Sequence, residues 1–72
     1  MEEELQQLYD YVVKNPSQKN RILQDVNYSI RMCETGMALG ENWHGGQTSE
    51  QWETEKNNWV ILKEKLEKIE ER

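Results

Sequence analysis

The chain is short and acidic, and both properties limit what it can be. It has 72 residues, with 14 Asp and Glu against 9 Lys and Arg, and a net charge of −5. A chain of this length forms one domain, residues 1–72, in the size range where a single-chain core is marginal. The acidic balance excludes general nucleic-acid binding, which needs surplus Lys and Arg to displace counterions.

Large aliphatic residues are scarce. Leu, Ile and Val together make up 14 of the 72 residues and Phe is absent, which lies near the compositional edge of disorder. Ordering the chain costs roughly 1.5 kcal/mol per residue, and apolar burial at about 25 cal/mol per Å² barely offsets that cost. We therefore predict that copies of the chain associate with one another, as a dimer or a higher bundle.

The expected location is the cytoplasm, with no contact with membranes. Cys33 is the only cysteine, so it cannot form a disulfide within one chain, and a lone cysteine is typical of a reducing compartment. No apolar run approaches the length that spans a membrane. The acidic start M-E-E-E-L is the opposite of the basic opening of a signal peptide.

The first predicted element is a helix over residues 2–14. Its apolar residues fall on one stripe at helical spacing, namely Leu5, Leu8, Tyr9, Val12 and Val13. Pro16 should end this helix, because it disfavours helical geometry at Asn15. Asn15 should then cap a second helix, with Pro16 at its first position and Gln18 closing a capping box.

The second helix is predicted over residues 16–39. Its apolar residues are spaced 3-4-3-4, as in a coiled coil, with Ile22 widening a seam made of Leu23, Val26, Ile30, Cys33 and Met37. The helix should end between Gly36 and Gly40, because glycine weakens a helix and accepts the left-handed conformation of a C-cap.

The third helix is predicted over residues 49–70, because Thr48 and Gln51 form a capping box. One seam along it is expected to be core, and contains Trp52, Trp59, Leu62, Leu66 and Ile69. No strand-like alternation or internal repeat is present. The predicted fold is all-α: a short N-terminal helix and an antiparallel two-helix hairpin, assembling into a homo-oligomeric bundle.

Charge is unevenly distributed along the chain. Residues 14–31 carry four basic side chains and one acidic one, Asp25, whereas residues 41–55 carry four Glu and no Lys or Arg. Segments of opposite sign suit an antiparallel or oligomeric arrangement that brings them together. Two separate solvated faces are the alternative.

The residues that catalysis or metal binding would need are few. His44 is the only histidine and Cys33 the only thiol, whereas a zinc site needs three or four ligands. Cys33 continues the apolar seam, where a buried thiol is usually inert. Gly45 and Gly46 lack the strand and the Lys-Ser/Thr of a phosphate-binding loop. We predict that the chain is not an enzyme and binds no metal or cofactor.

The segment G-E-N-W-H-G-G, residues 40–46, is expected to form the bend of the hairpin. Trp52 and Trp59 occupy seam positions and are expected in the core. Trp43 lies in the bend, where it either caps the hairpin or stays partly exposed as an anchor for a partner or a stacking platform for a base.

Residues 5–42 resemble the helical anti-defence sponge proteins of phages, which sequester cyclic nucleotide signals. The similarity lies in a short apolar helix, a break (here N-P-S-Q-K-N-R) and a long amphipathic helix (here I-L-Q-D-V-N-Y-S-I-R-M-C-E-T-G-M-A-L-G). It implies a non-enzymatic oligomer, in the host cytoplasm, that binds a small anionic ligand between protomers. From their chemistry, we assign the ligand to cationic and stacking side chains: Lys19, Arg21, Tyr28, Arg31, Trp43 and His44.

Residues 42–59 are similar to the WXG proteins, helical-hairpin substrates of type VII secretion. The similarity rests on W-H-G at residues 43–45, followed by Trp52 and Trp59. In that family W-x-G forms the turn between two antiparallel helices. Here the Asn15-Pro16 break interrupts what should be one continuous first helix, and no C-terminal secretion signal is recognisable.

The leading functional prediction is a phage-type protein that sequesters a nucleotide-like ligand, because the basic stretch 14–31 gives an acidic protein a local reason to attract anions. A WXG-like secretion partner is the second hypothesis. A third is a small acidic protein that inhibits a host protein through its Glu-rich face.

Overall fold

A computed structural model describes residues 3–43 and 46–70. Three α-helices span these residues: α1 Glu3–Lys14, α2 Lys19–Leu39 and α3 Ser49–Glu67. Two short 3₁₀ turns accompany them, η1 Pro16–Gln18 before α2 and η2 Gly40–Asn42 after it. Every regular element in the described ranges is therefore helical, and the predicted all-α class is confirmed.

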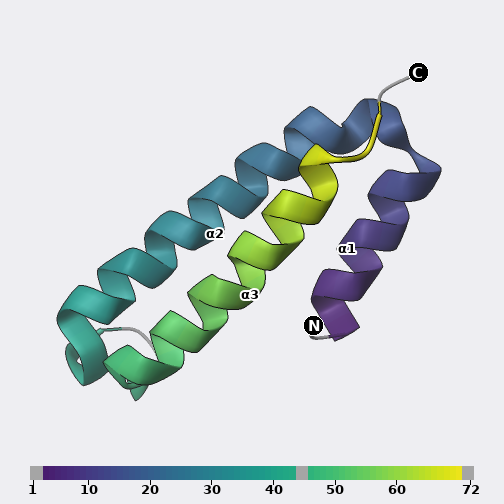
Figure 1. The fold of residues 1–72 in the computed structure, drawn as a ribbon. Helices are drawn as coiled ribbons and strands as arrows, with labels where there is room; N and C mark the ends of the chain where they lie inside the picture. The colour runs from purple at the N-terminus through teal and green to yellow at the C-terminus, as the bar shows by residue number, and fades with distance from the viewer. Residues whose placement is uncertain (1–2, 44–45, 71–72) are drawn as a thin grey trace.

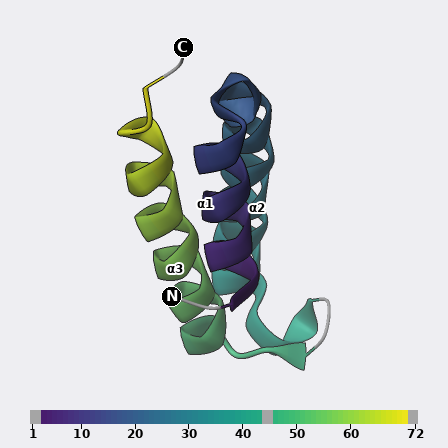
Figure 2. The same ribbon diagram turned by 90° about the vertical axis from the view of Figure 1, so that its right-hand side faces the viewer.

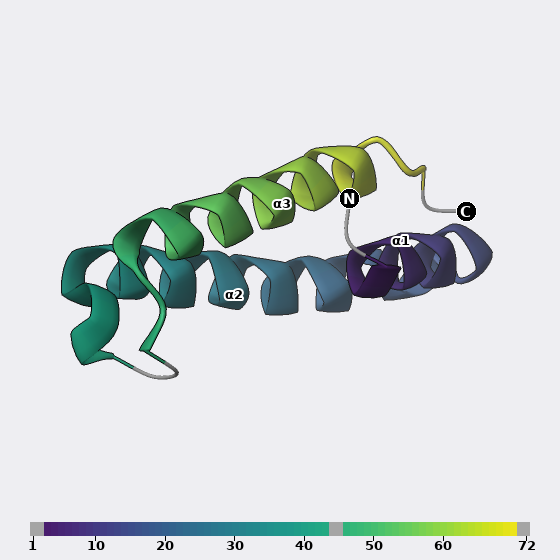
Figure 3. The ribbon, with the colours of Figure 1, turned by 90° about the horizontal axis from the view of Figure 1, so that it is seen from below.

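The helices pack side by side in an elongated molecule of 43 × 19 × 16 Å. Helices α2 and α3 lie along each other in opposite directions, and α1 folds back against them (Figures 1 and 2). We call the end formed by residues 40–43 and 46–48 the bend end, and the end where residues 15–18 approach residues 67–70 the junction end. At 1.5 Å per residue, α2 is about 31 Å long and α1 about 18 Å. Since α1 ends at the junction end, its first residues lie only part of the way towards the bend end (Figure 3).

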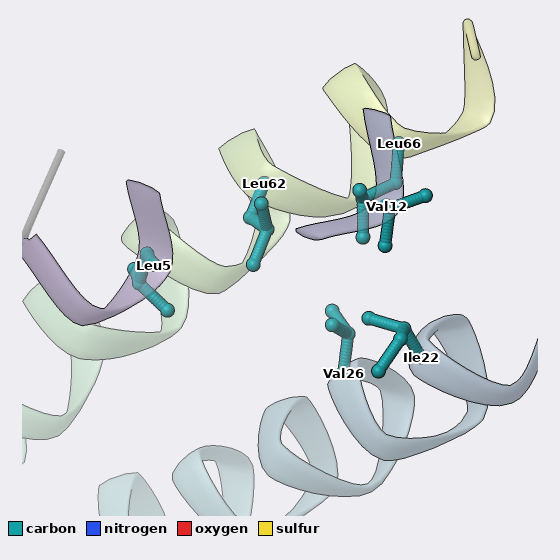
Figure 4. Packing of buried hydrophobic residues seen from close by; sticks show 6 residues of the cluster. All are labelled: Leu5, Val12, Ile22, Val26, Leu62 and Leu66. Carbon is teal, nitrogen blue, oxygen red and sulfur yellow. The ribbon is translucent and has the colours of Figure 1, made fainter. Parts of the chain in front are cut away.

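The main core lies where all three helices meet. Each helix contributes two buried side chains, which point towards one another in Figure 4: Leu5 and Val12, Ile22 and Val26, Leu62 and Leu66. Half-buried residues surround this cluster, among them Leu8, Tyr9, Leu23, Ile30, Trp59 and Ile69. The ammonium of Lys65 lies 5.9 Å from the centre of the Tyr9 ring, so α1 also holds α3 by a cation–π contact.

The break between α1 and α2 differs from the prediction. Asn15 does not cap the following helix with its side chain. Its Nδ2 instead donates to the carbonyl oxygen of Tyr11 at 3.0 Å, and its backbone N–H donates to the same oxygen at 2.9 Å. The predicted Asn15–Gln18 capping box is therefore wrong, because the Asn15 side chain closes the end of α1. Pro16 begins the 3₁₀ turn as expected for a residue without an N–H.

The other helix boundaries agree closely with the sequence pattern. Helix α2 ends at Leu39, and Gly40 follows it with φ of +57° and donates its N–H to the Gly36 carbonyl. At the start of α3, the Thr48 N–H donates to Oε1 of Gln51 at 2.9 Å, and the Gln51 N–H donates to Oγ1 of Thr48 at 3.2 Å. The predicted capping box at Thr48 is confirmed. Helix α3 ends at Glu67, three residues before the predicted end.

The buried line of α2 is shifted from the predicted seam. Its fully buried residues are Ile22, Val26, Cys33 and Gly36. Three of the predicted seam residues, Leu23, Ile30 and Met37, flank that line and are half-buried. On α3, Leu62 and Leu66 are fully buried while the other predicted core residues, Trp52, Trp59 and Ile69, are half-buried.

Candidate functional site: a hollow between α2 and α3

A hollow of about 280 Å³ lies between α2 and α3. Its lining comes from four residues of α2 and three of α3: Tyr28, Ser29, Met32 and Cys33, with Trp52, Glu55 and Trp59. No residue of α1 contributes. The hollow thus lies along the part of the α2–α3 pair that the shorter α1 leaves uncovered.

Small residues on α2 make room for large ones on α3. Ser29 occupies a position two turns after the buried Ile22, where a larger apolar side chain would fill the space between the helices. Gly36 is buried against Trp52, and a Cβ at Gly36 would overlap Cγ, Cδ2 and Cε2 of the indole ring. The indole therefore lies directly on the backbone of α2. This contact fixes Trp52 as a wall of the hollow.

The bend places a second indole ring beside that of Trp52. The ring of Trp43 lies 5.2 Å from the ring of Trp52, centre to centre, at a tilt of 48°. Such a tilted pair at this separation is a favourable aromatic contact. Trp43 is half-buried, so within the described residues it closes the bend end against α3.

The charged residue in the wall of the hollow is an acid. Glu55 lines it, and its Oε2 accepts from Nε2 of Gln47 at 3.4 Å. Lys56, the next residue along α3, pairs with Glu34 on α2 at 3.6 Å. Beyond Arg31, residues 32–55 carry five Glu and no Lys or Arg. The site thus presents aromatic and sulfur-containing surfaces beside a carboxylate.

Two further atoms of the lining are chemically unusual. Burial raises the pKa of the Cys33 thiol to about 11, and the charge of Glu55 adds to the shift. The thiol is therefore protonated at neutral pH, which suits packing and not nucleophilic chemistry. Nε1 of Trp52 is buried and has no hydrogen-bond partner within residues 3–43 and 46–70. A buried donor without an acceptor costs about 1–3 kcal/mol, which an acceptor on an incoming group would recover.

The predicted ligand residues do not gather at one place in a single chain. Lys19 lies at the junction end, where its Nζ donates to the Ile69 carbonyl at 2.9 Å. Trp43 lies at the opposite end of α2, where its ring contacts that of Trp52. Arg21 and Arg31 are exposed along α2. His44 lies outside the described residues.

Tyr28 is the predicted ligand residue that joins the hollow. Its side chain is 64% exposed although it lines the site. Sequence reasoning missed four contributors to this end of the molecule: Ser29, Met32, Gly36 and Glu55. A signal for two of them was present, because Ile22, Val26, Ser29, Cys33, Gly36 and Gly40 also repeat at spacings of three and four. Small residues carry no hydrophobic signal, so the flanking Leu, Ile and Met residues dominated the pattern.

The described residues form neither a metal-binding cluster nor a membrane-spanning helix. Among them, no three His, Cys, Asp or Glu side chains group closely enough to hold a metal ion. None of the helices that they form combines the length and apolar character needed to cross a membrane. Comparison with protein-family models, curated proteins and solved structures finds no match.

Proposed function

We propose that this chain is a non-enzymatic binding protein whose contact surface is the hollow between α2 and α3. The observation that carries the proposal is an aromatic hollow on a part of the α2–α3 pair that α1 does not cover. Aromatic side chains in partly desolvated pockets dominate the energetics of protein interfaces. The wall contains two tryptophans and a tyrosine, which is the composition of such a surface.

The occupant is a protein segment with apolar and basic character. The lining is mainly apolar, and its charged member, Glu55, is negative. A cation that reaches this wall gains both the carboxylate and the faces of the aromatic rings. An anion would meet Glu55 without a basic side chain in the lining, which disfavours a phosphate group at this position.

A substitution that fills the hollow tests this proposal. Ser29→Phe places a large side chain in the site from within the helix, whereas Ala38→Phe adds the same side chain at an exposed position of α2. We expect proteins captured by the wild-type chain and by Ala38→Phe to be lost with Ser29→Phe, measured by quantitative mass spectrometry. The captured proteins can include further copies of the chain itself. If Ser29→Phe captured the same proteins as the wild-type chain, the proposal would be contradicted.

A second candidate is the sequestration of an anionic, nucleotide-like ligand by an assembly of several chains. Its support is the placement of Arg21 and Tyr28, which are both exposed and lie seven residues, or two turns, apart on one side of α2. Cyclic dinucleotides should then raise the melting temperature of the wild-type chain and raise that of Arg21→Ala less. An unmoved melting temperature across a panel of such ligands argues against this candidate.

A third candidate, a WXG-like secretion partner, is supported by the contact of Trp43 in the bend with Trp52. It predicts that a secretion-competent host exports the chain and that export depends on Trp43. If all of the chain stayed inside such cells, the secretion hypothesis would be contradicted.

A further inference from the structure

We propose that the hollow is completed by a second copy of the chain, docked antiparallel, which brings its Arg21 to Glu55 and the tryptophans of the first copy. The inference rests on the proposed function, because it names the partner that fills the same hollow. It also assigns a residue from the partner copy to the site. The hollow of one chain is, in this arrangement, half of a site.

The first support is a second stripe on α2. Arg21, Tyr28, Met32 and Leu39 are spaced 7-4-7, so they project on one side of the helix. This stripe is not the buried line that faces α3. Tyr28 is 64% exposed and Leu39 is 47% exposed, while Met32 lines the hollow. An apolar stripe that ends in a cation is therefore uncovered in one chain.

The second support is charge. The basic side chains of Lys14, Lys19 and Arg21 lie near the junction end, whereas the five Glu of residues 32–55 occupy the far half of α2, the bend and the start of α3. Helix α2 is continuous between the two regions, so a single chain cannot bring Arg21 to Glu55. An antiparallel second copy sets each basic region beside an acidic one, twice.

The third support is the register that two-fold symmetry imposes. Residue i of one copy contacts residue j of the other, and j contacts i in return. Glu55 lies level with Cys33 on α2, since both line the hollow. Pairing Arg21 with Glu55 then places the axis halfway between residues 21 and 33. Tyr28, the most exposed large hydrophobic residue in the described ranges, falls next to that axis and meets its symmetry mate.

The chain has enough surface for such an interface. A standard protein interface buries about 800 Å² on each partner. The accessible surface of one chain is 5185 Å², so the interface needs less than a fifth of it. The stripe, the hollow and the acidic bend end together run along most of the length of α2.

A charge swap tests the inference by sedimentation velocity at low and high salt. We expect the wild-type chain to dimerise and salt to weaken the dimer. Arg21→Glu alone and Glu55→Arg alone should each weaken it at least ~10-fold in Kd, because each places like charges together twice. The double variant Arg21→Glu/Glu55→Arg should recover most of the affinity. Tyr28→Ala should weaken the dimer without a change of charge.

The matched control is Arg31→Glu. It makes the same charge change at an exposed position of α2, about 80° around the helix from the stripe. We expect it to leave the dimer within ~3-fold of wild type, and circular dichroism should show every variant folded. A wild-type chain that stays monomeric at submillimolar concentration, or a double variant without recovery, would overturn the inference. In that case the proposed function would still stand if Ser29→Phe abolished the capture of a different protein.

Discussion

At the scale of single residues, Gly36 determines the shape of the candidate site. The Trp52 indole occupies the space that any side chain at residue 36 would need. The sequence suggested Gly36 only as a point where the helix weakens, yet α2 continues three residues beyond it. A packing role for glycine leaves no signal in a hydrophobic pattern, because the large partner lies on another helix.

Gly36→Ala should therefore destabilise the chain although alanine favours helix. The gain in helix propensity is up to about 1 kcal/mol, whereas overpacking against Trp52 costs about 1–3 kcal/mol. We expect a net loss of roughly 1 kcal/mol, a melting temperature lower by about 4–8 °C, and altered near-ultraviolet circular dichroism from the Trp43–Trp52 pair. Ala38→Gly, at an exposed position of the same helix, should lower stability without altering that spectrum. A Gly36→Ala variant more stable than wild type would contradict the packing.

Cys33 gives a prediction with a defined pH range. Burial, with Glu55 adding to it, raises the pKa of the thiol from 9.0 to about 11 in the folded chain. Between these values the unfolded chain releases a proton that the folded chain retains, so stability is full below pH 9 and falls towards pH 11. The fall should be smaller in Cys33→Ala, which lacks the thiol. Equal pH dependence in the two chains, measured by urea unfolding, would show an unperturbed thiol.

At the scale of elements, local signals set most boundaries. The Thr48–Gln51 pair and the glycines after α2 were correctly read from the sequence, because capping and left-handed backbone depend on near neighbours. Asn15 was misread for a related reason. The same side chain can cap the helix that follows or close the helix that precedes, and it closes α1.

The Thr48 cap should contribute measurably to stability. Thr48→Ala removes the acceptor for the Gln51 N–H and leaves that donor to water. We expect a loss of about 1 kcal/mol in the free energy of unfolding, measured by urea denaturation. Ser49→Ala, one residue later and outside the capping box, should change it by less than about 0.5 kcal/mol. Equal losses in the two variants would mean that the box does not stabilise α3.

At the scale of the whole molecule, the unequal lengths of the helices matter most. The 12 residues of α1 cannot cover the 21 residues of α2. The three-helix core is confined to the junction half, and the bend half consists of two helices with a hollow between them. Composition predicted a chain short of apolar residues, but it could not predict where the uncovered surface would lie, since that depends on how far α1 reaches.

The same geometry changes how the predicted ligand residues are interpreted. Charge and aromatic character selected Lys19, Arg21, Tyr28 and Trp43 from the sequence, yet one chain spreads them from the junction end to the bend end. Two antiparallel copies bring Arg21 of each chain to the tryptophans of the other. The sequence indicated the residue types, and only the helix directions indicate how two chains could combine them.

In the proposed dimer, Arg21 of one copy occupies the hollow of the other. The most direct test is an isotope-filtered nuclear Overhauser experiment on an equal mixture of labelled and unlabelled chains. We expect intermolecular signals between the Arg21 side chain and the indole protons of Trp52 and Trp59, together with signals between the two Tyr28 rings. Intermolecular signals confined to α1, or none at submillimolar concentration, would contradict the proposed dimer.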